Sequence, residues 1–135
     1  MYLLDTDTII YALKDHPLVV DNFRRHEDDP KAISVMSYGE LIYGAERSAR
    51  REENLAKVRR LAEILPIIDV TRSVMDAFGA LKASTAAHGK TVADFDLTIA
   101  ATALCLGYRV VTNNLRHFSK IPGVVCESWA RPVSR

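Results

Sequence analysis

The sequence predicts an α/β fold, a three-layer α/β/α arrangement in which a central parallel sheet of four to five strands lies between helices. Short apolar runs alternate along the chain with longer segments of helical periodicity, and this alternation is typical of parallel strands joined by crossover helices. Residues 94–106 are apolar on nearly all sides, which indicates a buried helix. With 135 residues, 48% hydrophobic and 26% charged, the chain suits a single domain over residues 1–135.

Each expected element has its own local signals. The expected strands are residues 2–4, 32–36, 67–70 and 109–112, with 124–125 as a fifth. The expected helices are residues 8–14, 17–27, 37–46, 51–65, 71–88 and 94–106. Pro17 suits the first turn of a helix, Pro66 ends one, and Thr71 is a good N-cap. Gly89 and Gly107 are typical helix stops. The segment after about residue 129 is expected to be a loose tail.

The composition excludes several classes of protein. No apolar run approaches the ~18 residues that a membrane span needs, and Asp5 interrupts the N-terminal segment too early for a secretory signal. We therefore expect a cytoplasmic protein with no membrane contact. The 2 cysteines and 4 histidines have no metal-ligand spacing, and the G-x-S-x-G elbow of serine hydrolases is absent from the sequence.

Polar side chains follow or adjoin the predicted strands. Asp5 comes directly after strand 2–4, where a carboxylate is costly unless a cation or a substrate proton uses it. Glu40, Asp96 and Asn114 lie in the segments that follow or flank the other strands. Because sites in parallel sheets form at the carboxyl ends of the strands, one pocket can hold all four groups. Oxygen ligands without His or Cys suit magnesium or manganese, so we predict a metal-dependent phosphoryl-transfer site.

Two of the acidic residues also fit positions that cap helices. Asp7 suits the N-cap of the first helix, or a supporting position beside a metal. Glu40 is the fourth residue of Ser37-Tyr38-Gly39-Glu40, a capping-box pattern in which the Glu side chain bonds back to the amide of Ser37. Three other oxygen ligands are predicted near Glu40, and they favour metal binding there.

The start of the helix over residues 94–106 offers two candidate acids. We assign the N-cap to Asp94 and metal ligation to Asp96, one turn further on. Asn114 can lend a carbonyl oxygen to a metal, or it can serve as a turn or cap residue after strand 109–112. These alternatives stay open from the residues alone.

Basic residues are unevenly distributed, although the formal net charge is +1. Residues 47–60 contain six basic side chains and two acids. Arg47, Arg50 and Arg51 are therefore candidate RNA-binding residues beside the acidic pocket. The alternative is a solvated helix face with pairs such as Glu53 and Lys57.

Four short motifs together resemble one family. They are Leu3-Leu4-Asp5-Thr6, Ser34-x-x-x-x-Gly39-Glu40-Leu41-x-x-Gly44, His88-Gly89-Lys90 leading to Asp96-x-x-Ile99-Ala100-Ala101, and Val111-Thr112-Asn113-Asn114-x-x-x-Phe118. Their order and spacing resemble PIN-domain ribonucleases of the VapC toxin type, and the resemblance runs from Tyr2 to about Trp129.

The resemblance implies a magnesium-dependent endoribonuclease that forms a homodimer and is blocked by a cognate antitoxin. The family's acidic ligands fall on Asp5, Glu40 and Asp96, and its hydroxyl position beside the metal falls on Thr112. The fourth acid of the wider family falls on Asn114. The resemblance also places Asp7, where Asn is common, and Thr6 in supporting positions.

We expect Asp5 and Asp96 to ligate the metal most directly, and Glu40 to bind through water or to orient the nucleophile. Two other functions fit parts of the sequence. Asp5-Thr6-Asp7, with the later Val111-Thr112-Asn113, resembles the first two motifs of haloacid-dehalogenase-type phosphatases, in which Asp5 would be the nucleophile. That family also needs a later Lys and a downstream acidic pair. A non-catalytic module that binds RNA or protein is the other alternative.

Overall fold

The computed structural model of the protein describes residues 1–132. The sheet contains β1 (Tyr2–Leu4), β2 (Lys31–Ser34), β3 (Ile67–Ile68), β4 (Arg109–Val111) and β5 (Cys126–Glu127). The strand order is β3-β2-β1-β4-β5, and every pair is parallel. In the central register Leu3 lies between Ala32 and Val110. The prediction of a parallel sheet is confirmed.

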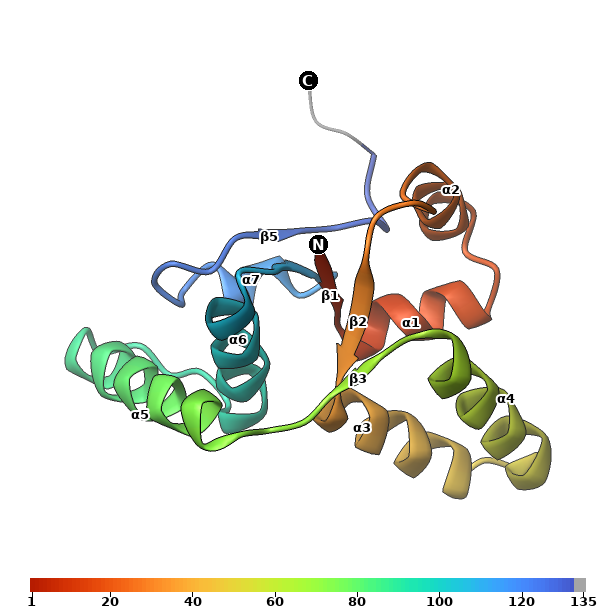
Figure 1. Cartoon of the computed structure of the whole chain (residues 1–135), viewed down its shortest axis with the longest axis horizontal. Coiled ribbons are helices and arrows are strands. Elements are labelled where there is room, and N and C mark those ends of the chain that lie inside the picture. The colour runs from red at the N-terminus through yellow and green to blue at the C-terminus, as the bar shows by residue number, and fades with distance from the viewer. Residues whose placement is uncertain (133–135) are drawn as a thin grey trace.

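Helices cover both faces of this sheet (Figure 1). They are α1 (Thr6–Leu13), α2 (Pro17–Arg25), α3 (Val35–Glu46), α4 (Arg51–Ile64), α5 (Arg72–Ala87), α6 (Asp94–Leu106) and α7 (Leu115–Phe118). Successive strand residues point to opposite faces, so Leu3 packs in a core with residues of α5, α6 and α7, whereas Leu4 packs with residues of α1 to α4. The three-layer α/β/α prediction is therefore confirmed. None of the helices described is long and apolar enough to cross a membrane.

Local signals placed some boundaries well and others badly. Helix α6 has the predicted bounds and ends at Gly107, whose φ is 69°, a left-handed conformation that glycine adopts without strain. Thr71 caps α5, as expected. The first helix begins at Thr6 rather than at residue 8, because Asp5 is its N-cap. The four-residue helix α7 was not expected, since it is too short for periodicity to reveal.

The ends of the chain depart from expectation in detail. The fifth strand is β5 rather than residues 124–125, although the carbonyl of Val125 already accepts a bond from the amide of Val110. Trp129 is buried at 1% exposure and packs edge-on against Phe23 and Tyr2. The predicted loose tail after about residue 129 therefore begins beside a buried anchor, and residues 133–135 lie outside the described part of the chain.

The start of α3 contradicts the predicted capping box. Strand β2 ends at Ser34, and the Ser34 hydroxyl accepts a 3.1 Å bond from the amide of Met36, so Ser34 is the N-cap. Ser37 lies inside the helix, and its buried hydroxyl finds no hydrogen-bond partner within residues 1–132. Glu40 therefore has no cap at Ser37 to complete, and the capping-box interpretation was wrong.

Two serine substitutions should separate these assignments. We expect Ser34→Ala to lower the free energy of unfolding by about 1 kcal/mol, as for other N-caps that are replaced by alanine. Ser37→Ala should leave it unchanged or raise it, because the change removes a buried hydroxyl without a partner. Urea unfolding of both variants measures this, and a larger decrease for Ser37→Ala than for Ser34→Ala would contradict the assignment.

Candidate active site

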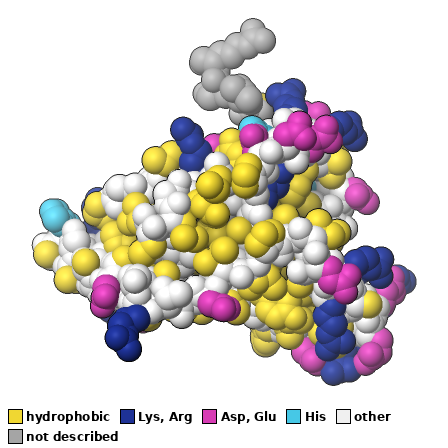
Figure 2. All heavy atoms as spheres, in the orientation of Figure 1, with side chains coloured by type: hydrophobic (Ala, Val, Ile, Leu, Met, Phe, Trp, Pro, Cys, Tyr) yellow, Lys and Arg dark blue, Asp and Glu magenta, His cyan; other side chains and the backbone are white. Residues whose placement is uncertain are grey.

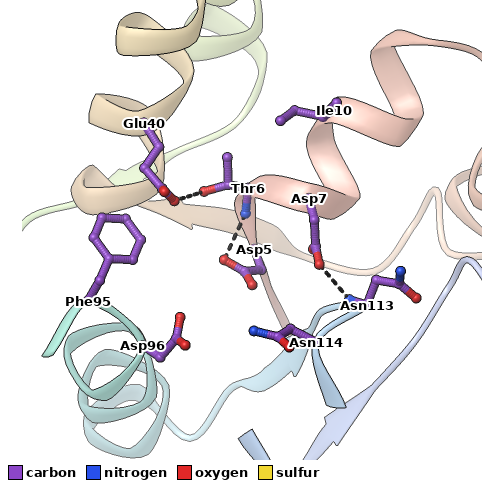
Figure 3. Close-up of a pocket in the computed structure, with 9 residues that line it drawn as sticks. All are labelled: Asp5, Thr6, Asp7, Ile10, Glu40, Phe95, Asp96, Asn113 and Asn114. Atoms are coloured by element: carbon purple, nitrogen blue, oxygen red, sulfur yellow. Dashed lines mark hydrogen bonds between the residues drawn. The ribbon is translucent and has the colours of Figure 1, made fainter. Parts of the chain in front are cut away.

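An open hollow of about 470 Å³ lies at the carboxyl edge of the sheet and contains the predicted acidic residues. It is lined by Asp5, Thr6, Asp7, Ile10, Glu40, Phe95, Asp96, Asn113 and Asn114. In Figure 3 the side chains of Asp5, Asp96 and Asn114 converge on this space from different elements. All four residues predicted to be catalytic thus share one pocket.

The sheet order explains this convergence. Strand β1 is central and pairs with β2 on one side and β4 on the other. Asp5 follows β1 directly, and Asn114 is the third residue after β4, so both lie at the same edge of the sheet. Glu40 projects from α3, which follows β2, and Asp96 lies in the first turn of α6. Sites of α/β proteins form at this edge for the same reason.

Asp5 is held by hydrogen bonds to both carboxylate oxygens. The amide of Thr6 donates to Oδ1 at 2.8 Å, and the hydroxyl of Thr112 donates to Oδ2 at 2.8 Å. Thr112 is fully buried, and its oxygen accepts a 2.9 Å bond from the amide of Asn114. A chain of hydrogen bonds therefore links the segment after β4 to the carboxylate that ends β1.

Asp7 and Glu40 are also tied to neighbouring elements. The backbone amide of Asn113 donates a 3.0 Å bond to Oδ2 of Asp7. The Thr6 hydroxyl donates a 2.6 Å bond to Oε1 of Glu40. Asp7 lies inside α1 and does not cap it, so the N-cap interpretation of Asp7 was wrong. Its carboxylate instead lines the pocket from the supporting position that was the alternative.

The two acids at the start of α6 have different surroundings. The N-cap of α6 is Ala93, so the cap predicted for Asp94 was wrong. Asp94 is exposed and pairs with Lys82 at 3.0 Å, outside the pocket. Asp96 lines the pocket, and its Oδ2 lies 3.6 Å from Nδ1 of His117.

The electrostatics of the pocket disfavour several ionised carboxylates. Burial, and then the charge of Asp7, raise the pKa of Asp5 to about 7, although the hydrogen bonds from Thr112 and Thr6 oppose this rise. Burial also raises the pKa values of Asp7 and Asp96, while His117 lowers that of Asp96 in part. No Lys or Arg of the described chain lines this hollow. A bound cation would favour the charged forms of all three.

The donor set fits a hydrated ion better than a closed cage. Among residues 1–132 no three His, Cys, Asp or Glu side chains are grouped closely enough to hold an ion by themselves. Magnesium keeps several waters and is bound through one or two carboxylates together with substrate phosphate oxygens. An open, polar hollow that is lined by Asp5 and Asp96 is compatible with that mode of binding.

The candidate RNA-binding arginines lie outside this pocket. Arg51 binds Glu46 at 2.6 Å and also pairs with Glu52, and Arg50 lies 3.7 Å from Glu53. Arg47 lies over the ring of Tyr43, 5.5 Å from its centroid. Figure 2 shows basic and acidic side chains interleaved over this end of the molecule. These contacts match the solvated helix face, and RNA binding by the three arginines stays a prediction.

Several pocket residues were not anticipated from the sequence. Asn113 contributes its backbone amide to Asp7, and Phe95 and Ile10 supply apolar walls. The side-chain amide of Asn114 lies 2.8 Å from Nδ1 of His117, which also approaches Asp96. The three-residue spacing between Asn114 and His117 would have indicated this contact only if α7 had been predicted.

Comparison with known proteins places the chain in a family. The PIN domain family model matches residues 2–124. The "tRNA(fMet)-specific endonuclease VapC" of Salmonella typhimurium is 37% identical over 95% of this chain and 97% of its own length. "Ribonuclease VapC2" of Haemophilus influenzae is 34% identical over the same shares of the two chains.

A solved structure agrees with these three matches. The structure of VapBC2 from Rickettsia felis, bound to a DNA fragment from its promoter, contains a chain with a TM-score of 0.88 and 31% identity, covering 95% of this chain and 98% of that one. The family match spans strands β1 to β4 and every acidic residue of the pocket. This chain belongs to the PIN-domain family and is a VapC-type member of it.

Proposed function

We propose that the protein is a magnesium-dependent endoribonuclease that hydrolyses RNA phosphodiester bonds, and that it is the toxin of a toxin–antitoxin pair. The observation that carries this proposal is the gathering of Asp5, Glu40 and Asp96 in one hollow without a basic lining residue among those described. The relatives' names support the reaction and the substrate, since they are ribonucleases, and one is specific for a tRNA.

In this proposal Asp5 and Asp96 hold the ion, and manganese can replace magnesium because both prefer oxygen ligands. The ion would neutralise charge on the phosphate and make a nearby water more acidic. Thr112 fixes the orientation of Asp5. Glu40, positioned by the Thr6 hydroxyl, orients the attacking water or accepts its proton. Asp7 adds negative charge to the pocket, and Asn114 offers its carbonyl oxygen.

The two alternative functions have less support. A haloacid-dehalogenase-type phosphatase needs a lysine beside its nucleophile, and none lines the hollow among the described residues. A non-catalytic binding module would need Asp5 only as the N-cap of α1, although burial raises the pKa of this carboxyl to about 7. Cleavage that is abolished by chelation of the metal would exclude the binding module.

We further propose that the protein acts in the cytoplasm as a homodimer inhibited by a cognate antitoxin. The solved structures from R. felis and S. typhimurium are VapBC complexes, which supports a protein partner. The acidic hollow would attract a guanidinium, which binds carboxylates bidentately and would displace the metal.

The first prediction for this function compares three aspartates. Asp5→Asn and Asp96→Asn each remove a charge from the hollow and should lower magnesium-dependent RNA cleavage by at least about 100-fold, a barrier increase of about 2.7 kcal/mol. Asp94→Asn is the matched control, since Asp94 lies two residues from Asp96 but outside the hollow, and it should retain the parent rate. Near-parent cleavage by a folded Asp5→Asn variant would remove Asp5 from the mechanism.

The second prediction concerns stability and pH in the presence of EDTA. The pKa of Asp5 is about 7 in the folded state against 3.8 ordinarily, so the folded protein keeps a proton that the unfolded chain releases across this range. The free energy of unfolding should therefore fall as the pH rises from about 4 to about 7. Asp5→Asn cannot lose this proton, so its stability relative to the parent should increase by about 2 to 4 kcal/mol over that window.

Denaturant titrations of both proteins at several pH values measure this difference. A constant offset, such as one from the altered bond to Thr112, does not affect the slope. Magnesium should counteract the decrease in the parent at neutral pH, because it favours the ionised carboxylates. A difference between the two proteins that does not vary with pH would contradict the assignment.

The third prediction concerns the antitoxin. An arginine of the antitoxin should lie within hydrogen-bond reach of Asp5, Glu40 or Asp96. Asp96→Asn should then weaken antitoxin binding by about tenfold or more, and replacing that arginine with Ala should abolish the difference between parent and variant. A structure of the complex with no basic residue at these carboxylates would contradict the prediction.

A further inference from the structure

A second polar hollow, which shares no lining residue with the active pocket, has the opposite charge. It measures about 230 Å³ and is formed by the end of α5, the loop before α6 and the segment after α7. Its polar lining consists of Ser84, Thr85, His88, Lys90, Ser119 and Lys120. No acidic side chain of the described chain lines it.

The two lysines of this hollow are not neutralised. Some basic side chains of the chain have an acidic neighbour, since Lys82 pairs with Asp94 and Arg51 pairs with Glu46. Lys90 and Lys120 form no ion pair with any acid among residues 1–132. Two ammonium groups that share a hollow repel each other unless an anion lies between them.

Hydrogen bonds fix the frame of the hollow and leave its charged groups free. The backbone amide of Lys90 donates to the carbonyl of Thr85 at 2.9 Å, and that of Lys120 donates to His117 at 3.3 Å. The ring of His88 lies 2.8 Å from the Ser84 carbonyl through Nδ1. Because a carbonyl only accepts, Nδ1 carries the proton, and this bond fixes the orientation of the ring. The site thus offers cationic donors on an ordered backbone.

The hollow adjoins the active pocket through short segments of chain. Lys90 lies in the loop that leads directly into Asp96, and Lys120 follows the four-residue helix α7 that begins after Asn114. His117, which contacts both Asp96 and Asn114, lies on α7, three residues before Lys120. The acidic pocket and the basic hollow are therefore connected through α7 and the segment that follows it.

We propose that this hollow binds a backbone phosphate of the RNA, with Lys90 and Lys120 as the phosphate-binding residues. This inference rests on the proposed ribonuclease function. Lysines that bind phosphates position a strand without reading its bases, so the hollow sets where the strand lies over the metal site. It also offers RNA cationic groups other than Arg50 and Arg51 at the α3–α4 turn, whose charges are already paired.

The test uses a charge-matched pair of double variants. Lys90→Gln/Lys120→Gln removes both lysines, and Arg59→Gln/Arg60→Gln removes the same charge from exposed positions of α4, at the other end of the molecule (Figure 1). RNA binding is measured in EDTA, which prevents cleavage, over a range of salt concentrations. The slope of log affinity against log salt should decrease by about 0.7 for each phosphate that the lysine variant no longer binds, and should not change in the arginine variant.

Cleavage provides an independent readout. With magnesium present, the lysine variant should show KM raised by about tenfold and kcat within about twofold of the parent, because the lysines bind the ground state and the transition state equally. Shortening the RNA from each end should identify one length at which the affinity of the parent falls by the same factor as the lysine substitutions cause with the full-length RNA. Below that length the parent and the lysine variant should cut equally well.

Other results would overturn the inference. An unchanged salt slope in the lysine variant, or an equal change in the arginine variant, would show that the hollow is not a specific phosphate site. A change of oligomeric state in light scattering, with the salt slope unaltered, would assign the hollow to an interface between protein chains. A parent protein that binds RNA through the lysines but does not cut it would contradict the proposed function while supporting this inference.

Discussion

The hydrogen bond from the Thr112 hydroxyl to Asp5 joins the ends of the two central strands, and the geometry of the pocket depends on it. Thr112 follows β4 and Asp5 follows β1, so the bond sets the relative height of the two strand ends. The same hydroxyl oxygen accepts the amide of Asn114, which orients the turn into α7. Removing this hydroxyl would leave a buried carboxylate oxygen without a donor, a cost of roughly 1 to 3 kcal/mol, and would release the segment that carries Asn114 and His117. The Thr112 hydroxyl therefore supports both the sheet and the pocket.

The burial of neighbouring carboxylates in the pocket lowers the free energy of unfolding. Asp5 is only 7% exposed and lies close enough to Asp7 for its charge to raise the pKa. The chain provides hydrogen-bond donors to Asp5, Asp7 and Glu40 but no cationic side chain among the residues that line the hollow. Donors of this kind orient carboxylates without neutralising them. The remaining negative charge is available to an ion or to a partner's guanidinium, and these two occupants would compete for the same space.

Much of this architecture could be predicted from the sequence, and the failures have physical causes. The alternation of strands and helices predicted the parallel sheet, and the sheet brought Asp5, Glu40, Asp96 and Asn114 into one hollow. The N-cap of α3 could not be chosen locally, because Ser34 and Ser37 are both good caps and only the pairing of Ser34 with Ile68 in the sheet decides between them. The hydrogen bond between Asp7 and Asn113 joins residues 106 positions apart, so no local pattern contains it. Helix α7 and the position of His117 depend on tertiary packing of Phe118 in the core.

Charge in this protein has to be judged by what remains unpaired, rather than by counting residues. Of the six basic residues between 47 and 60, Arg50, Arg51 and Lys57 have an acidic neighbour within 4 Å, whereas Arg47, Arg59 and Arg60 form no ion pair within residues 1–132. A paired charge acts on a distant phosphate mainly as a dipole, and salt at physiological concentration screens it beyond about 8 Å. Lys90 and Lys120 also form no ion pair within the described residues, and they share one hollow that has no acidic lining residue there. An acidic site that must receive a polyanion needs such a charge close to its edge, because a cation bound at the centre can neutralise one phosphate but not the strand on either side of it.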